Sequence, residues 1–477
     1  MNTKLFRSCV FAAGLVGASG CSGDATPSTA ASTATAAAGA TAAAADSVAP
    51  ATTTTLAPVV TEPAIEVVQV FDPAVVHTVS FKYVAADFDK IIAEFRADGS
   101  KSWIEATVTL DGQIYPRAGL RLKGNSSLFG LGGNAVPFPV INQPPTSDQP
   151  SISDKPPTTE AKTAISGPEH PERLPWLIRL DKYVKGQKHQ GYTDFVIRSN
   201  GTETSLNERL ALQLLDTVGL STQKSMSVKF NVNGGVSELR TITEYLNDDW
   251  ADASFTKNAL LYKAGDKGDY SYRGTDSAAY AGAWDQDGGK IGGVDDLAPL
   301  IEFLDFINNS ADPDFAANLD SRVNTQALAK YLAMEELMLN FDDLDGPGNN
   351  SYLAYEPTSE RMTVVAWDHN LAFTAIEDVA KGILPPGVNF PPGVFEQILK
   401  SVAKPNPLVI RAKAIPEFMA MYQQDLIDLK AELFDSGKAE AMLQKLAETL
   451  NEQASELVDA ATVKADVAYI VDKFPKP

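Results

Sequence analysis

Residues Asn340 to Phe373 read NFDDLDGPGNNSYLAYEPTSERMTVVAWDHNLAF, and this stretch is the most informative part of the sequence about the fold. It opens with three aspartates in four residues: Asp342, Asp343 and Asp345. A Gly-Pro-Gly turn leads to Asn350, and an alternating apolar run, Met362 to Trp367, leads to Asp368. This pattern predicts an acidic loop, a short hairpin and a further acid where the second strand ends. Such oxygen ligands suit Mg²⁺, although Asp, Asn and Gly are also common turn formers.

The composition is that of a large globular protein. The chain has 477 residues, of which 44% are hydrophobic, so a sizeable core can form. Its formal net charge is −21, and the acidic residues are spread along the chain. Proteins that bind nucleic acid usually carry a basic face, so no nucleic-acid partner is expected here. The acidity is ordinary for an exported protein that must stay in solution.

Residues 1–21 have the pattern of an export signal. A positively charged start precedes a short apolar run, and small residues lead to Cys21. Small residues followed by Cys resemble a bacterial lipoprotein signal, in which this Cys carries the lipid. Simple secretion is the alternative, because Ala18 stands where Leu is usual. We therefore expect an exported protein that meets a membrane only through Cys21, since no stretch is long enough to span a bilayer. Residues 22–66, rich in Ala and Thr, predict a disordered tether.

Residues 67–246 are expected to form a β-rich half. Alternating apolar patterns predict strands at 76–81, 103–110, 114–122, 176–180, 193–198, 225–232 and 239–245. Helices are predicted at 87–97 and after Ser205, where Glu208 completes a capping box. We expect a sheet with the second helix inserted after its third or fourth strand. Residues 129–172 show no periodicity and predict a long loop, of a kind that is functional or disordered.

Residues 247–477 are expected to be mainly helical. Helices are predicted at 297–308, 313–319, 325–339, 393–403, 416–433 and 436–460, and the hairpin of 340–373 lies among them. Residues 285–288 read Asp-Gln-Asp-Gly but lack the full ligand set of a calcium loop, so we interpret them as a turn. The two halves together predict an α+β fold.

Asp345 and Asn350 have four residues between them, which is the spacing of the protein-kinase catalytic loop. In that layout a β-rich lobe supplies a cation for the phosphates, braced by a helix Glu, and a helical lobe supplies the metal-binding acids. Arg179 or Lys182, at the end of a predicted strand, is the candidate cation, and Glu208 is the candidate brace. A surface charge and a plain capping residue are the alternative interpretations.

Several segments, in order, resemble the spore-coat protein H (CotH) kinase-like family over roughly residues 67–435. They are GLRLKGNSS at 119–127, PWLIRLDKY at 175–183, SLNERLA at 205–211, NNSYLAY at 349–355 and WDHNLAF at 367–373. The chain departs from the family pattern in four places. Lys123 stands for a second Arg, Leu174 for a basic residue before the Pro, Asn349 for a His, and Asn370 for a second Asp.

The resemblance implies a divergent, two-lobed protein-kinase-like fold. It implies ATP- and Mg²⁺-dependent phosphorylation of Ser or Thr in proteins outside the cytoplasm. By the family pattern, Asp345 is the catalytic residue, while Asn350 and Asp368 hold the metal. Asp342 and Asp343 stay open as alternatives to Asp345, because the register of the loop before Asn350 is not set by sequence.

The resemblance also places a nucleotide-binding cation, Arg121 or Arg179, next to Glu208. Two other functions stay open on the same fold. One is a non-catalytic surface protein that binds or assembles with others, since fold alone does not determine function. The other is a phosphotransferase that acts on a small molecule or an envelope glycan.

Overall fold

The computed structural model describes residues 68–124, 126–132, 167–265, 268–290, 293–346, 348, 350–380 and 406–476. These residues belong to one compact unit, Glu66–Pro477. The predicted signal at 1–21, the tether at 22–66, most of the loop at 129–172 and the helix at 393–403 lie outside the described residues. Within the described ranges, no helix is long and apolar enough to cross a membrane.

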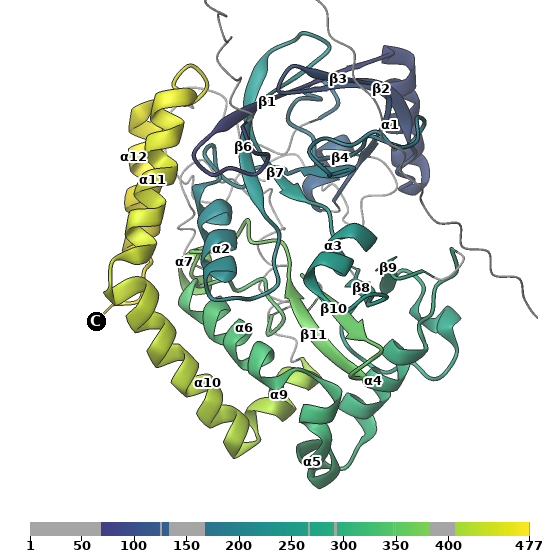
Figure 1. The fold of residues 1–477 in the computed structure, drawn as a ribbon, viewed down its shortest axis with the longest axis vertical. Helices are drawn as coiled ribbons and strands as arrows, with labels where there is room; N and C mark the ends of the chain where they lie inside the picture. The colour runs from purple at the N-terminus through teal and green to yellow at the C-terminus, as the bar shows by residue number, and fades with distance from the viewer. Residues whose placement is uncertain are drawn as a thin grey trace, which may run out of the picture. The chain divides into compact units, whose positions relative to one another are not determined.

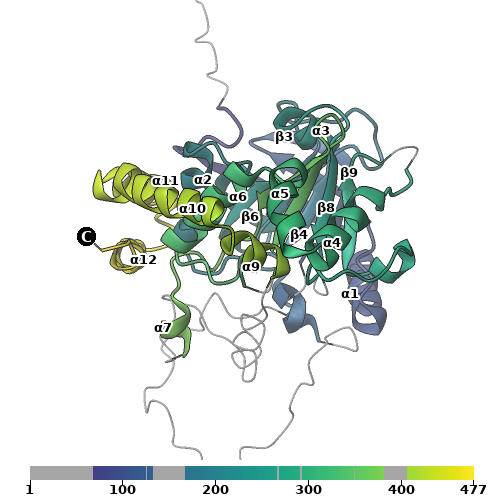
Figure 2. The same cartoon turned by 90° about the horizontal axis from the view of Figure 1, so that it is seen from below.

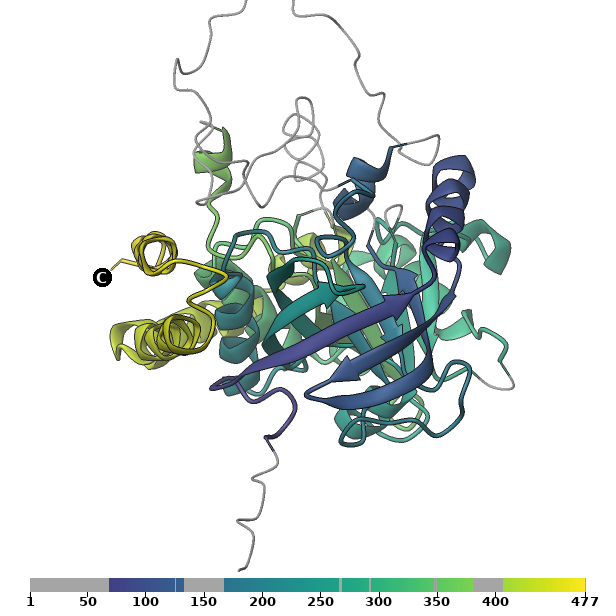
Figure 3. The same ribbon diagram turned by 90° about the horizontal axis from the view of Figure 1, so that it is seen from above.

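The first half forms a closed barrel of seven strands (Figures 1 and 3). They are β1 (Val76–Tyr83), β2 (Ile104–Leu110), β3 (Gln113–Leu122), β4 (Trp176–Arg179), β5 (Asp194–Ile197), β6 (Ser225–Val232) and β7 (Ser237–Glu244). Their order is β1-β2-β3-β4-β5-β7-β6. The expectation of a sheet with one helix after its third or fourth strand was wrong, because two α-helices interrupt the barrel strands and neither follows the third or fourth strand. β1 pairs in parallel with β6 and so closes the sheet, which leaves no unpaired edge.

Two helices interrupt the barrel strands. Helix α1 (Ala85–Asp98) follows β1, and helix α2 (Leu206–Thr217) follows β5, the fifth strand. The barrel interior is filled by alternate strand residues, among them Phe81, Trp176 and Phe230. The hydrophobic side chains of α2 belong to the other large core, which they share with the helices of the second half. Helix α2 therefore connects the barrel to the rest of the molecule.

A second sheet has the order β11-β10-β8-β9. It contains β8 (Leu260–Ala264), β9 (Trp284–Gly288), β10 (Ser351–Glu356) and β11 (Arg361–Ala366). The prediction of a turn at 285–288 was wrong, because these residues form β9, which pairs antiparallel with β8. Trp284 and Gln286 are buried while Asp285 faces solvent, so the segment has the two-residue period of a half-buried strand.

Most of the remaining helices lie around this sheet, whereas α11 and α12 lie along α2 (Figure 1). They are α3 (Asp248–Ser254), α4 (Ala298–Asn309), α5 (Asp312–Arg322), α6 (Thr325–Leu337), α7 (Ile376–Ala380), α9 (Pro407–Lys413), α10 (Pro416–Leu429), α11 (Lys438–Gln453) and α12 (Ala460–Asp472). A π-helical segment, Lys430–Asp435, continues α10, and short 3₁₀ segments occur at Ser126–Leu131 and Ser277–Tyr280. The helix predicted at 436–460 stops at Gln453, because Asp459 caps a separate helix, α12.

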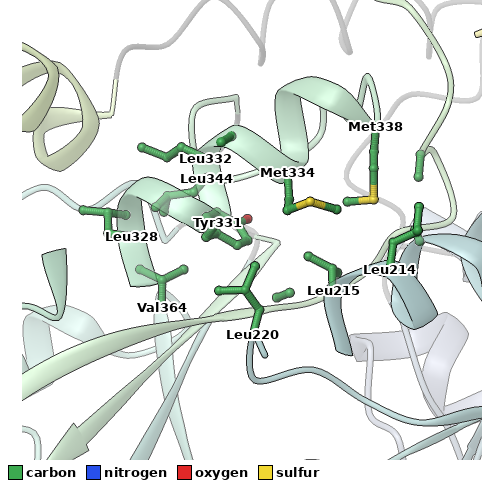
Figure 4. Packing of buried hydrophobic residues seen from close by; sticks show 14 of the residues in the cluster. Leu214, Leu215, Leu220, Leu328, Tyr331, Leu332, Met334, Met338, Leu344 and Val364 are labelled. Carbon is green, nitrogen blue, oxygen red and sulfur yellow. The ribbon is translucent and has the colours of Figure 1, made fainter. Parts of the chain in front are cut away.

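Helix α6 runs through the centre of the larger core. It is buried on nearly all sides, as expected for an interior helix, and it packs against α10. Figure 4 shows Tyr331 and Met334 of α6 facing Leu215 of α2 and the nearby Leu220. Figure 2 shows α10 and α11 on the flank of α6 and α2. The end of α6 leads directly into the acidic loop, so the packing of α6 in this core holds the start of the loop in place.

Candidate functional site

The β10–β11 hairpin brings two polar loops together. Ser351 pairs with Ala366, so Asn350 and Trp367 lie at the same end of the hairpin. The acidic loop therefore ends where the segment with Asp368 begins. Asp368 has φ 67°, in the left-handed region that few residues other than Gly adopt. Such strain in a non-glycine residue is often found at functional sites.

Arg198, which the sequence reasoning missed, lies at the centre of the site with its side chain 13% exposed. The Arg198 Nε donates to Glu208 Oε1 at 2.9 Å, and its Nη2 donates to Asp368 Oδ1. Burial by itself would lower the pKa of Arg198, but the Asp368 and Glu208 carboxylates outweigh it and raise that pKa. Arg198 therefore stays charged and connects the helix carboxylate to the acid after β11.

Glu208 is buried on α2 and braces a cation, as predicted, but it does not form the predicted capping box. Ser205 has φ 51°, and its side chain makes no capping hydrogen bond. The Leu206 N–H donates instead to Thr204 Oγ1 at 3.2 Å. Burial raises the pKa of Glu208, and the charge of Arg198 opposes this rise. The Glu208 carboxylate, in the first turn of α2, therefore pairs with Arg198 instead of forming a capping box.

Asn350 contacts Asp342, which was one of the open alternatives for the catalytic residue. The Asn350 Nδ2 donates to Asp342 Oδ2 at 2.7 Å and to the Asp342 carbonyl at 3.0 Å. Burial, and then the charge of Asp368, raises the pKa of Asp342 to about 7, while the charge of Lys263 opposes the rise. Asp342, Asn350 and Asp368 therefore share one electrostatic environment.

Asp345 lies apart from this group. Its Oδ2 accepts from Lys413 Nζ at 2.7 Å, and the side chain is 40% exposed. Asp345 and Asp343 line a separate cavity of about 280 Å³ with Glu336 and Tyr422. Asp343 is buried and accepts from the Gly346 N–H at 2.9 Å. The contacts of the acidic loop thus bring Asp342, rather than Asp343 or Asp345, to Asn350.

Two lysines lie beside the site, and burial disfavours the charged form of each. Burial, and then the charge of Lys123, lowers the pKa of Lys263 on β8 to about 7. Burial also lowers the pKa of Lys123, whose ammonium lies 5.1 Å from the Tyr245 ring centroid and 5.6 Å from that of Trp367. The carboxylates of β9 act on both lysines and oppose these shifts. Lys123 was noted in the sequence as a departure from the family pattern, whereas Lys263 was not noticed.

Within the described part of the chain, none of the three candidate phosphate cations, Arg121, Arg179 and Lys182, contacts Glu208, whose ion-pair partner is Arg198. Arg179 Nε pairs with Asp194 Oδ1 at 2.6 Å. The guanidinium carbons of Arg121 and Arg179 lie 5.1 and 5.7 Å from the Trp103 ring centroid, and Lys182 Nζ lies 4.9 Å from it. Arg121 also lowers the pKa of Lys123 through its charge, an effect smaller than that of burial.

The residues of the site are compatible with Mg²⁺. Among the described residues, no three His, Cys, Asp or Glu side chains come together to hold a metal ion by themselves. Mg²⁺ usually binds one or two carboxylates and completes its shell with phosphate oxygens and water. Asp368 and Asn350 can supply such oxygen ligands, and a divalent cation beside them would relieve the repulsion between Asp368 and Asp342, which adds to burial in raising the pKa of Asp342.

A cation braced by a helix Glu, two aspartates and an asparagine are residue types that a kinase-like site combines. The model of the family described as CotH kinase protein matches residues 167–470, and the chain belongs to this family. The GLRLKGNSS motif at 119–127 precedes the matched residues. A search of curated proteins found no match.

Among solved structures, the chain is similar to a Helicobacter pylori protein titled as the proinflammatory kinase CtkA. The identity is 10%, the TM-score is 0.28, and the match covers 60% of this chain and 87% of the other. A TM-score this low supports no inference about fold or function.

Proposed function

We propose that this protein is an ATP- and Mg²⁺-dependent phosphotransferase that phosphorylates Ser or Thr of exported or surface proteins. The family is a kinase family, and the site combines a braced cation with two acids and an asparagine. We also propose a divergent two-lobed arrangement, with the barrel as one lobe and the second sheet and helices as the other. Export and a lipid anchor at Cys21 remain part of the proposal.

In this proposal, each residue has one task. Arg198, braced by Glu208, aligns the nucleotide phosphates, and Asp368 and Asn350 hold the metal. Asp342 replaces the predicted Asp345 as the residue that orients the acceptor hydroxyl, because Asp342 contacts Asn350 and Asp345 does not. Mg²⁺ would neutralise charge on the transferred phosphoryl group and on the leaving phosphate. Catalysis of this kind rests almost wholly on positioning and electrostatics.

One observation carries the proposal: Arg198 contacts Glu208 and Asp368 at the same time. A buried cation between a helix carboxylate and the acid after β11 is costly to bury unless its charge is used or fully paired. In phosphoryl-transfer enzymes such a cation is braced by a helix Glu so that it can meet the phosphates. Arg198 therefore joins α2 to the segment that follows the β10–β11 hairpin.

The test separates nucleotide binding from transfer. Mg²⁺–ATP should raise the thermal stability of the full chain, by about 2.7 kcal/mol at a hundredfold excess over Kd. Asp368→Asn should lose this shift. Asp342→Asn should keep the shift but lose transfer of labelled phosphate from ATP to a Ser/Thr peptide library. Asp345→Asn is the matched control and should keep both.

Two results would contradict the proposal. No stabilisation of wild type by millimolar Mg²⁺–ATP would refute the nucleotide site. Transfer that survives in Asp342→Asn but stops in Asp345→Asn would return the catalytic role to Asp345, as the family pattern implied.

A non-catalytic surface binding or assembly protein is the second candidate. The observation that favours it is that Asp368 already accepts a hydrogen bond from Arg198, so that one oxygen of the proposed metal ligand is engaged by the protein itself. Binding of Mg²⁺–ATP without any transfer to the peptide library would support this candidate.

A further inference from the structure

Glu335 is a fully buried carboxylate on the last turn of α6, and both of its oxygens are used. Its Oε1 lies 2.8 Å from His369 Nε2, and its Oε2 accepts from Asn340 Nδ2 at 2.7 Å. The Glu335 and His369 side chains are each 1% exposed. Hydrogen bonds to a charged group inside a protein are stronger than neutral ones, so this bridge is a firm contact.

The bridge joins the two segments that carry the acids of the site. Asn340 lies two residues before Asp342, and His369 directly follows Asp368. The backbones of these segments also meet, since Asn340 forms a parallel bridge with Thr374. Glu335 thus contacts both segments close to the residues that the proposed function uses.

Backbone strain gathers at the same place. Leu339 has φ 49°, Asp368 has φ 67° and Phe373 has φ 61°. Left-handed conformations cost bulky residues roughly 1–2 kcal/mol each, and they persist only where surrounding contacts enforce them. All three lie within a few residues of Asn340 or His369. The cluster indicates that the two segments are held in one defined arrangement.

We propose that Glu335 is a positioning residue that sets the separation of Asp342 and Asp368 by holding Asn340 and His369. The inference rests on the proposed function, which assigns these two acids their roles. Loops at the end of a hairpin are mobile unless other contacts hold them in place. A displacement of 1 Å at a catalytic group can cost about a hundredfold in rate. Glu335 ties both loops to the rigid end of α6.

A purely stabilising role is the alternative, and the chain offers a matched comparison. His77 is buried in the barrel, and its Nδ1 lies 2.7 Å from Asp111 Oδ2. This pair also joins a buried imidazole to a carboxylate, but it fastens the turn after β2. If burial and pairing alone matter, loss of either pair should affect stability and nothing else.

The experiment compares Glu335→Ala, Glu335→Gln and His369→Gln with the control His77→Gln, all in the full chain. The dissociation constant for Mg²⁺–ATP is measured by calorimetry, and unfolding in urea is measured without ligand. Glu335→Ala and His369→Gln should weaken Mg²⁺–ATP binding by about ten- to a hundredfold, as residues that orient metal ligands usually do. Glu335→Gln should lose less, because its amide can still meet both partners. His77→Gln should lose stability and bind as wild type does.

Hydrogen exchange in the ligand-free protein gives a readout that does not depend on binding. Glu335→Gln and Glu335→Ala should both speed amide exchange at residues 338–346 and at 366–374 together, whereas His77→Gln should change neither. Faster exchange in only one of the two segments would overturn the positioning role, as would unchanged Mg²⁺–ATP affinity in Glu335→Ala. If wild type binds no Mg²⁺–ATP, the proposed function fails by itself, and the exchange result still decides whether Glu335 couples the segments.

Discussion

Replacing Asp342 by Asn should make the ligand-free protein more stable at neutral pH. Burial, and then the charge of Asp368, raises the pKa of Asp342 from an ordinary 3.8 to about 7. Because the folded pKa lies above the unfolded value, the protonated form favours folding. That contribution is complete below about pH 4 and is lost as the pH rises through about 7. Asn is uncharged, like protonated Asp342, and its side-chain oxygen can still accept a hydrogen bond from Asn350.

The expected size follows from the shift. A change of about three pKa units corresponds to ~4 kcal/mol at 1.36 kcal/mol per unit. The Asp342 side chain is only half-buried and Lys263 offsets part of the repulsion, so we expect about half of this ceiling, ~2 kcal/mol. The advantage of Asp342→Asn over wild type should grow between about pH 4 and pH 7 and level off above that.

Urea unfolding of both proteins between pH 5 and pH 8, in EDTA to exclude metal ions, measures this difference directly. Asp345→Asn is the control. It removes only a surface pair with Lys413, which is worth ~0–1 kcal/mol and should not change with pH in this range. Parallel stability profiles for wild type and Asp342→Asn would refute the reasoning, since they would mean that Asp342 is charged in the folded protein without cost.

Three further predictions concern other residues. Arg198→Ala should cost ~3–5 kcal/mol in urea unfolding because it leaves the buried Glu208 carboxylate unpaired. Arg179→Ala should cost less, ~1–2 kcal/mol, because its partner Asp194, although buried, keeps hydrogen bonds from Thr193 and Asn247. Gly119→Ala should cost ~1–3 kcal/mol in thermal unfolding, since an added Cβ would lie 2.6 Å from Lys182 Cβ. Asp466→Asn should stabilise the protein at pH 8 more than at pH 4, because burial raises the pKa of Asp466 to about 6.

Each of these has an outcome that would count against it. Equal losses for Arg198→Ala and Arg179→Ala would mean that burial of the first pair carries no weight. A neutral Gly119→Ala would show that Lys182 can move aside without cost. A pH-independent effect of Asp466→Asn would show that its hydrogen bond from Thr204, at 2.6 Å, keeps the carboxyl ionised despite burial.

Sequence periodicity predicted most of the strands and helices close to their observed bounds. β2 shows why, since its buried and accessible residues alternate along the strand and the Asp111-Gly112 turn that follows needs two left-handed residues. The prediction failed at β9, where two aspartates at alternate positions resembled a turn. A strand with one polar face has the same residues, and only its pairing with β8 distinguishes the two.

The structure brings some of the candidate site residues together. Glu208, Asn350 and Asp368 lie together with the cation and acids that the sequence reasoning sought, but Arg198 was missed in favour of Arg179. A signal for Arg198 was present, since it directly follows β5 in the segment before α2, and kinases place this cation on a strand and its partner Glu on a helix. The roles of all these residues stay predictions.

The features that could be predicted from the sequence are local ones: the order of strands and helices, the acidic loop, the hairpin and the family motifs. These follow from patterns within about ten residues, because side-chain direction repeats with the period of each element. The tertiary fold determines which aspartate contacts Asn350 and which cation contacts Glu208. The Arg198–Asp368 contact spans 170 residues of sequence, and its partners are chosen by barrel closure and by the packing of α2 on α6, which no local pattern contains.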